Sequence, residues 1–448
     1  MSKGVQYYVQ EANEAQKRVT EYRQTVKSWK FDTIAVHGMY SLEETLANQG
    51  SIAEPIFVST SQAYRDSDEM EAGLSYQMPT WAYSRIHNPT VYYLEETLAL
   101  LETYSTDLDA SALCTSSGMS AIKQAIEPFL EKKDDKPINF VTPSQIYGGT
   151  YQLFNVRMPE RGAVPHWVED PSDIETWKDQ IDENTRFLYA EMPTNPQQSC
   201  FDIEEVAKLA HEHGIPLIVD STISTPALLR PIQFGADIVG HSLTKTIGSS
   251  GSAIGGAIIA RHNLTSKHLT DEQKGNYAVW LKLLPFRDSG PCMSPYSAYV
   301  FLNEIKTLRI RMKHYSENAM EVVRFLKNHP KIEKIDYLGV EDHKNHNLAK
   351  KYMKLVDSDT PMFGHLMSIY IKGDSSNTRA FFDKLNLFRR ATDLGRTKSI
   401  ATICAISTHL QQGEEGQKKA GIPQNLVRLC IGGEDSQDII NDLKQALE

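Results

Sequence analysis

Short apolar runs alternate with amphipathic stretches between about residues 110 and 260. Four to eight apolar residues bounded by turn signals are typical of a buried strand, whereas apolar positions three or four apart are typical of a helix. The pattern predicts a strand from residue 112 that turns into a helix near 118, strands at 138–142, 187–191, 215–220 and 236–240, and a helix at 203–213. Strands and helices in this alternation predict a large α/β domain with a parallel or mixed sheet.

The pattern changes after about residue 300. A long helical stretch at 298–326 is followed by a strand at 366–371, a helix at 379–385, a strand at 425–432 and a last amphipathic helix. These elements predict a smaller C-terminal α+β domain. We therefore expect three parts: residues 1–75, 76–300 and 301–448.

The first of these parts has two predicted pieces. Residues 1–30 are rich in Gln, Glu, Lys and Arg and predict a helical arm. This arm is either a solvated helix or a helix that packs on a neighbouring subunit. Residues 31–75 predict an irregular crossing segment, because Pro55 fits a loop or an edge position better than a central strand.

Composition narrows the class of protein. The 448 residues are 40% apolar and 23% charged, and no run of eighteen apolar residues predicts a membrane span. A net charge of −10 without a basic block argues against nucleic acid or a membrane surface as partner. From the polar start we expect no signal peptide, and the five scattered cysteines form no CxxC pair, which argues against a metal site and against disulfides. We expect a cytoplasmic enzyme with reduced thiols.

Two apolar runs end in residues with complementary chemistry. Asp220 closes the run 215–220, and Lys245 follows the run 236–240. The carboxyl ends of parallel strands meet at one edge of a sheet, so we expect these two side chains to lie close together. A lysine can form a Schiff base with a carbonyl cofactor, and a buried aspartate can keep a pyridine nitrogen protonated. This pair predicts pyridoxal 5'-phosphate (PLP) as the cofactor.

Residues before two helices are candidates for binding the phosphate of such a cofactor. Ser117, Gly118 and Met119 stand where a strand turns into a helix, and the free N–H groups at a helix start bind anions. Tyr83 and Arg85 precede another predicted helix and could add a hydroxyl and a guanidinium fork. Each feature has an ordinary alternative, which is a capped helix start in the first case and a pair of surface residues in the second.

Loops after two other strands carry further candidates. Tyr147 follows the strand 138–142 and could stack on a flat ring. Asn195 stands between Pro193 and Pro196, which block continuation of a helix or strand and leave the Asn195 amide free to reach a ligand.

Arg428 lies in the apolar strand predicted at 425–432, where an unpaired charge is costly. It therefore needs a carboxylate. Either an Asp or Glu of the same chain supplies one in an internal salt bridge, or an amino-acid substrate does.

Seven blocks, taken together and in order, resemble the PLP-dependent enzymes of Cys/Met metabolism. That family includes cystathionine γ-synthase, cystathionine lyases, methionine γ-lyase and O-acetylhomoserine sulfhydrylase. The blocks are residues 83–90, 117–119, 147–150, 191–196, 219–222, 241–245 and 428–434. The resemblance covers roughly residues 32–448. It implies a fold-type I, aminotransferase-like subunit in a homotetramer of two tight dimers, with each active site shared across a dimer.

The resemblance also implies a role for each candidate residue. Lys245 would bond to the cofactor and Asp220 would pair with its ring nitrogen. Tyr147 would stack on the ring and supply the acid that assists the leaving group. Arg428 and Ser399 would bind the substrate. The full set of expected cofactor contacts is Lys245, Asp220, Ser117, Gly118, Met119, Tyr147, Asn195, Ser242 and Thr244, with Tyr83 and Arg85 contributed across the dimer.

Several features favour one branch of the family. The long stretch before the first block and the segments 394–399 and 407–409 are similar to the O-acetylhomoserine branch, and Gly149 stands where the methionine-lyase branch usually has a cysteine. We therefore expect γ-replacement on an O-acyl-homoserine by sulfide or a thiol. The alternative is methionine γ-lyase or cystathionine γ/β-lyase activity. A third possibility, an interaction protein that kept the fold without PLP, is disfavoured by Lys245 and Asp220.

Two departures from the family pattern bear on substrate binding. Asp393 stands where many relatives have a serine beside the substrate carboxylate. It would repel that carboxylate unless it is turned away or paired, and Arg396 is the candidate partner. The loop 246–251 lacks the aromatic residue and the histidine that relatives often have, so access to the cofactor is expected to differ.

Overall fold

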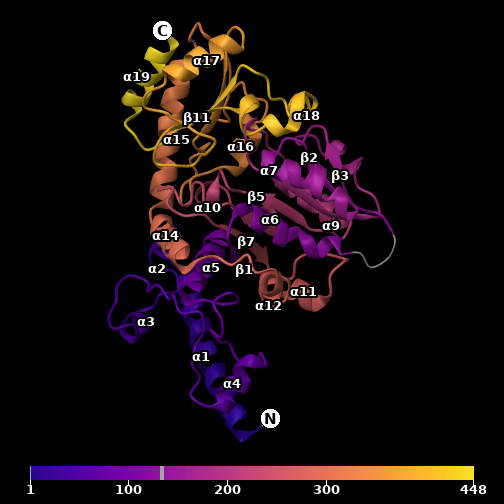
Figure 1. The fold of residues 1–448 in the computed structure, drawn as a ribbon, viewed down its shortest axis with the longest axis vertical. Coiled ribbons are helices and arrows are strands. Elements are labelled where there is room, and N and C mark those ends of the chain that lie inside the picture. The colour runs from indigo at the N-terminus through magenta and orange to yellow at the C-terminus, as the bar shows by residue number, and fades with distance from the viewer. Residues whose placement is uncertain (1, 132–135) are drawn as a thin grey trace.

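The computed structural model describes residues 2–131 and 136–448. Two sheet domains form the body, and the arm helix α1 projects away from it together with α4 at the N-terminal end (Figure 1). The helices are α1 (Lys3–Lys27), α2 (Phe31–His37), α3 (Leu42–Ala47), α4 (Ser67–Leu74), α5 (Pro89–Glu102), α6 (Gly118–Ile126), α7 (Gly148–Gln152), α8 (Ile174–Lys178), α9 (Ile203–Glu212), α10 (Thr225–Leu228), α11 (Asp271–Gly275), α12 (Tyr277–Leu283), α13 (Pro285–Ser289), α14 (Pro295–Ile305), α15 (Leu308–Leu326), α16 (His346–Tyr352), α17 (Ser375–Lys384), α18 (Gly413–Lys419) and α19 (Ser436–Leu447). The strands are β1 (Ala110–Thr115), β2 (Ile138–Pro143), β3 (Ala163–Val168), β4 (Thr185–Glu191), β5 (Leu217–Asp220), β6 (Ile238–His241), β7 (Gly256–Arg261), β8 (Ile332–Asp336), β9 (Leu366–Ile371), β10 (Arg389–Arg390), β11 (Ile400–Ile403) and β12 (Leu426–Cys430).

Within the described residues, seven strands form the larger sheet in the order β1-β7-β6-β5-β4-β2-β3. Strands β3, β2, β4, β5 and β6 pair in parallel, whereas β7 is antiparallel to both β6 and β1. The sheet is therefore mixed, and β3 and β7 are two strands that the apolar pattern did not predict. Because β4, β5 and β6 run in the same direction, their carboxyl ends still share one edge of the sheet.

Both faces of this sheet are buried. Along β4, Leu188 and Ala190 join the core that includes α5 and α9, whereas Phe187 and Tyr189 join a second core that includes α6 and α12. Successive residues of a strand point to opposite faces, so each face has its own helical cover. This arrangement explains why the strands are continuous apolar runs without polar alternation.

The smaller sheet belongs to the C-terminal part of the chain. In the described residues its order is β10-β11-β12-β9-β8, and its pairs are antiparallel except β10 with β11. Strand β9 has the predicted bounds 366–371, while the predicted helix 298–326 is two helices, α14 and α15. The two sheets confirm an α/β architecture with a second, smaller domain. The boundaries at residues 75 and 300 stay a prediction.

The N-terminal arm packs on its own chain at both ends. Near its start, Val5 and Tyr8 of α1 form a small core with Ala72 of α4. Near its end, Arg23 of α1 donates to Glu96 of α5 at 2.9 Å. The segment 31–75 is less irregular than predicted, because it contains α2, α3 and α4. In the described part of the chain, no helix is both long and apolar enough to cross a membrane.

Candidate active site

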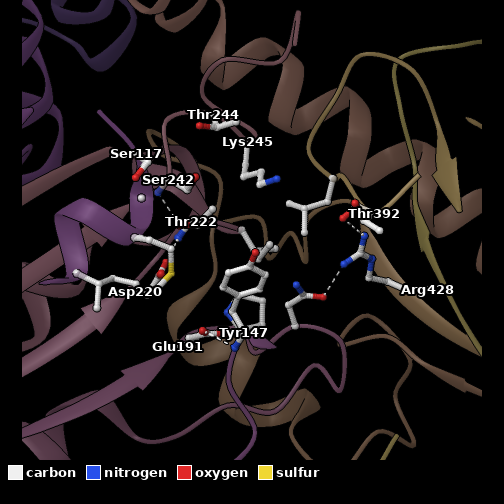
Figure 2. Close-up of a pocket in the computed structure, with 17 residues that line it drawn as sticks. Ser117, Tyr147, Glu191, Asp220, Thr222, Ser242, Thr244, Lys245, Thr392 and Arg428 are labelled. Carbon is white, nitrogen blue, oxygen red and sulfur yellow. Dashed lines mark hydrogen bonds between the residues drawn. The ribbon is translucent and has the colours of Figure 1, made fainter. Parts of the chain in front are cut away.

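The carboxyl edge of the larger sheet brings most of the candidate residues together around one cavity of about 200 Å³. Asp220 is the last residue of β5, and Lys245 lies on the turn that follows β6. In Figure 2, Asp220 and Arg428 lie on opposite sides of the cavity, with Lys245 and Tyr147 between them. The predicted residues that line it are Ser117, Gly118, Met119, Tyr147, Asn195, Asp220, Ser242, Thr244, Lys245 and Arg428.

The start of α6 forms one corner of the cavity. Ser117 caps this helix by accepting the Ser120 N–H at 3.1 Å. Gly118 and Met119 are the first residues of the helix, whose N–H groups have no acceptor within it. A Cβ on Gly118 would lie 2.7 Å from the Ser242 Cβ, so only glycine allows the helix start to approach this loop. The N–H groups and the hydroxyls of Ser117, Ser242 and Thr244 make this corner, which we call the anion corner, suited to a phosphate.

Two carboxyls, the buried Glu191 and the half-buried Asp220, lie side by side at the ends of β4 and β5. Glu191 is in register with Asp220 across these parallel strands. Burial raises the pKa of Asp220, but the Thr222 N–H donates to its carboxylate at 2.9 Å and opposes this effect. Burial, and then the charge of Asp220, raise the pKa of Glu191 well above its ordinary value. We infer that Glu191 keeps its proton and that Asp220 carries the negative charge.

Lys245 reaches into the cavity and forms an ion pair with Asp393. The Lys245 Nζ donates to the Asp393 Oδ1 at 2.6 Å. Arg396 pairs with the other carboxylate oxygen of Asp393, as the sequence suggested. Burial tends to raise the pKa of Asp393, but hydrogen bonds and charge from Lys245 and Arg396 bring it below its ordinary value. Asp393 is therefore ionised at neutral pH and is neutralised by two cations.

Arg428 is 1% exposed and extends from β12 toward the cavity. Its guanidinium donates to the Asn195 Oδ1 at 3.2 Å and to the backbone carbonyls of Thr392 and Asp393 at 3.2 and 2.7 Å. Among the described residues, no carboxylate forms a salt bridge with it, so the internal salt bridge considered from the sequence is not formed. Burying a cation without a counter-charge is costly, which suits a site that binds a carboxylate from outside.

The Tyr147 side chain is 39% exposed at the cavity. Its backbone N–H donates to the Glu191 Oε1 at 2.6 Å, which ties the loop to the end of β4. Burial raises the pKa of the Tyr147 hydroxyl. This hydroxyl therefore keeps its proton at neutral pH and can act as an acid.

Comparison with known proteins identifies the family. The sequence model described as "Cys/Met metabolism PLP-dependent enzyme" matches residues 32–448.

The chain belongs to this family.

Similar proteins extend the match over nearly the whole chain. A homocysteine synthase from Schizosaccharomyces pombe is 36% identical, over 94% of this chain and 99% of that protein. An L-methionine gamma-lyase from Fusobacterium nucleatum subsp. polymorphum is 34% identical, over 94% of this chain and 99% of that protein. A Campylobacter jejuni crystal structure, described as an O-acetylhomoserine (thiol)-lyase containing pyridoxyl-lysine monophosphate, has a TM-score of 0.83 and 32% identity, over 94% of this chain and 100% of that one.

The chain is thus a PLP-dependent enzyme of Cys/Met metabolism with a fold-type I, aminotransferase-like subunit. The residues around the cavity fit the cofactor. The anion corner suits its phosphate, Asp220 suits a protonated ring nitrogen, and the Lys245 amine suits its aldehyde. Within the described residues, no cluster of three or more His, Cys, Asp or Glu side chains could hold a metal ion.

Three residues predicted for this PLP enzyme do not line its cavity. Ser399 is buried, and its hydroxyl donates to the Glu434 carboxylate at 2.9 Å. Tyr83 is 44% exposed, with the Arg85 guanidinium 5.3 Å from its ring centroid. The Arg85 guanidinium also donates to the backbone carbonyl of Arg287. Tyr83 and Arg85 are thus exposed on the surface of the chain.

Other lining residues of the PLP site were not predicted from the sequence. They are Ile122, Glu191, Pro193, Thr222, Ile223, Thr392 and Leu394. Of these, Glu191 carried a usable signal, because it is an acid at the end of an apolar run, as Asp220 is. Thr222 carried a weaker one, since it stands two residues after Asp220; its hydroxyl accepts the Ser242 N–H at 2.8 Å.

Proposed function

We propose that this enzyme catalyses γ-replacement on an O-acylated homoserine, with sulfide or a thiol as the incoming nucleophile. The observation that supports an α-amino acid as substrate is the environment of Arg428. This buried cation lacks a carboxylate partner in the described structure and lines the same cavity as Lys245. The similarity to a homocysteine synthase supports a sulfur-transfer reaction.

The Gly149 position favours replacement over methionine cleavage. A Cβ at Gly149 would lie 2.6 Å from the Tyr147 Cε1. The Tyr147 ring therefore occupies the space that a cysteine at this position would need. We assign methionine γ-lyase or cystathionine lyase activity as the alternative function, because a methionine gamma-lyase is also a relative at 34% identity.

Four side chains around the cavity have a role in this proposal. Bound PLP withdraws electrons from the α-carbon of an attached amino acid. Lys245 moves protons at the substrate carbons once its amine is free, and Asp220 keeps a proton on the ring nitrogen. Arg428 binds and orients the substrate carboxylate. Tyr147 donates a proton to the leaving group. Ser399 is left out, because its hydroxyl is bonded to Glu434 instead.

A substrate assay distinguishes the two candidate functions. We expect the holoenzyme to convert O-acetylhomoserine and sulfide to homocysteine, and to release little 2-oxobutanoate from methionine alone. Both products are measured by chromatography, with a parallel reaction lacking sulfide as control. Rapid formation of 2-oxobutanoate from methionine, without homocysteine formation from O-acetylhomoserine, would establish the lyase instead.

We further propose a cytoplasmic homotetramer built as a dimer of dimers, with each active site shared across a dimer. Among the described residues of the anion corner, none is a cation. A phosphate dianion is bound best with an added guanidinium. The exposed Arg85 and Tyr83 can supply this group and a hydroxyl to the site of a second subunit. The cysteines of the described chain are free, which suits a reducing compartment.

Subunit mixing tests the shared site. Arg85→Ala and Lys245→Ala chains are each expected to have very low activity. After they are dissociated together and reassembled, about one quarter of the wild-type activity should return, because half of random dimers are mixed and each contains one intact site. Activity is measured per subunit, with each variant carried through the same procedure alone. Absence of recovery despite confirmed exchange of subunits contradicts a shared site.

A further inference from the structure

Asp393 connects the two cations that the proposed reaction needs. Its carboxylate accepts from the Lys245 Nζ at 2.6 Å. Its backbone carbonyl accepts from the Arg428 guanidinium at 2.7 Å. One residue thus contacts both the amine assigned to the cofactor and the guanidinium assigned to the substrate carboxylate.

The position of this carboxylate is fixed by the packing of two loops. Arg396 donates to the carbonyls of Thr244 and Gly248 at 2.7 and 3.0 Å, and it pairs with Asp393 as well. The approach is close, since a Cβ on Gly395 would lie 2.5 Å from the Thr246 backbone nitrogen. The loop that carries Asp393 therefore lies directly against the loop that carries Lys245.

Limited access of water makes the ion pair between the Lys245 amine and the Asp393 carboxylate harder to open. The Lys245 and Asp393 side chains are 24% and 29% exposed, so water solvates their charges only in part. Exchanging this ion pair for hydration is therefore less favourable than at an open surface. An amine held as an ammonium cannot attack a carbonyl carbon, because its lone pair is bonded to a proton.

We propose that Asp393 is a positioning residue for Lys245: its carboxylate holds the amine whenever the amine is not bonded to the cofactor, and this ion pair must open before the cofactor is loaded. The inference rests on the proposed role of Lys245. It assigns Asp393 a function in loading, in addition to any effect on substrate binding. Arg396 then has a second purpose, because it neutralises Asp393 while Lys245 is engaged and keeps its charge from repelling a substrate carboxylate.

Loading of the full-length apoenzyme tests this inference. Asp393→Asn keeps the shape of the side chain and removes its charge, so PLP should attach roughly fivefold faster than in the wild type. The rate is followed by the absorbance change after mixing with PLP, and the modified residue is identified by borohydride reduction and mass spectrometry. Arg396→Gln, which removes the guanidinium that bonds to the Thr244 and Gly248 carbonyls but keeps both charges of the Lys245–Asp393 ion pair, should give no acceleration. Asp393→Ser provides a second neutral variant should the first fold poorly, as judged by circular dichroism.

The outcomes separate this inference from the function on which it rests. Faster loading in Asp393→Asn or in Asp393→Ser, without acceleration in Arg396→Gln, supports it. If the folded neutral variants load PLP at the wild-type rate or more slowly, and the reduced cofactor is still found on Lys245, this inference alone is overturned. If the reduced cofactor of the wild-type protein is found on a residue other than Lys245, both this inference and the proposed function are overturned.

Discussion

Replacing Lys245 with alanine is expected to lower turnover by at least ~10³-fold, the largest effect of any substitution in this enzyme. The variant loses both the amine that bonds to the cofactor and the base that moves protons at the substrate carbons. The anion corner and Asp220 are unchanged, so PLP should still bind without a covalent bond. Turnover is measured with O-acetylhomoserine and sulfide, and attachment by the visible absorbance of a lysine-bound cofactor.

Lys245→Arg is the matched control for this experiment. It retains a cation that can pair with Asp393, so the local charge balance is preserved, but a guanidinium does not supply a neutral amine at neutral pH. We expect it to be as inactive as the alanine variant and at least as stable to heat. Substantial turnover with either variant, or a retained lysine-cofactor absorbance, shows that another residue does the work assigned to Lys245.

The placement of Asp220 and Lys245 at one sheet edge could be predicted because it depends on strand order along the chain. Strands β5 and β6 are consecutive and parallel, so the residues at their ends meet at one edge. The position of β7 could not be predicted in the same way. It pairs with β1, which precedes it by more than a hundred residues, and no local pattern specifies that partner.

The contact of Lys245 with Asp393 shows where sequence reasoning reaches its limit. The need for a partner to Asp393 followed from its charge, and Arg396, three residues away, was the local candidate. Lys245 is 148 residues distant. It reaches Asp393 only because the loop before β11 packs against the turn after β6. The charge of Asp393 indicates that this residue needs a cationic partner. The packing of distant loops determines which cations it contacts.

The sequence does not define whether the side chains of Ser399 and Arg428 face the cavity or the protein interior. The hydroxyl of Ser399 could face the cavity or the protein interior, and in the structure it donates to Glu434. The Arg428 guanidinium had the same two alternatives, and in the structure it lies at the cavity. The pattern of apolar residues places Arg428 in a predicted strand but predicts no strand beside Ser399, and it does not define which neighbour either side chain contacts.

Replacing Asp220 with asparagine is expected to lower kcat by about 10²- to 10³-fold while Lys245 still bonds to the cofactor. An asparagine has the same shape but no charge, so it cannot keep a proton on a pyridine nitrogen. The ring then withdraws electrons less strongly from the substrate α-carbon, which raises the barrier to proton removal. The effect should fall on kcat, since Arg428 still binds the substrate carboxylate. Steady-state kinetics of holoenzyme with O-acetylhomoserine and sulfide measure it.

Glu191→Gln is the matched control, because it makes the same chemical change one strand away. Burial and the charge of Asp220 raise the pKa of Glu191 well above its ordinary value, so the native side chain is already neutral and can be replaced by a neutral amide. Either side-chain form can accept the Tyr147 N–H that Glu191 bonds at 2.6 Å. We therefore expect kcat to fall less than about tenfold in Glu191→Gln. An equal loss in both variants contradicts the assignment of the charge to Asp220, and a larger loss in Glu191→Gln places that charge on Glu191.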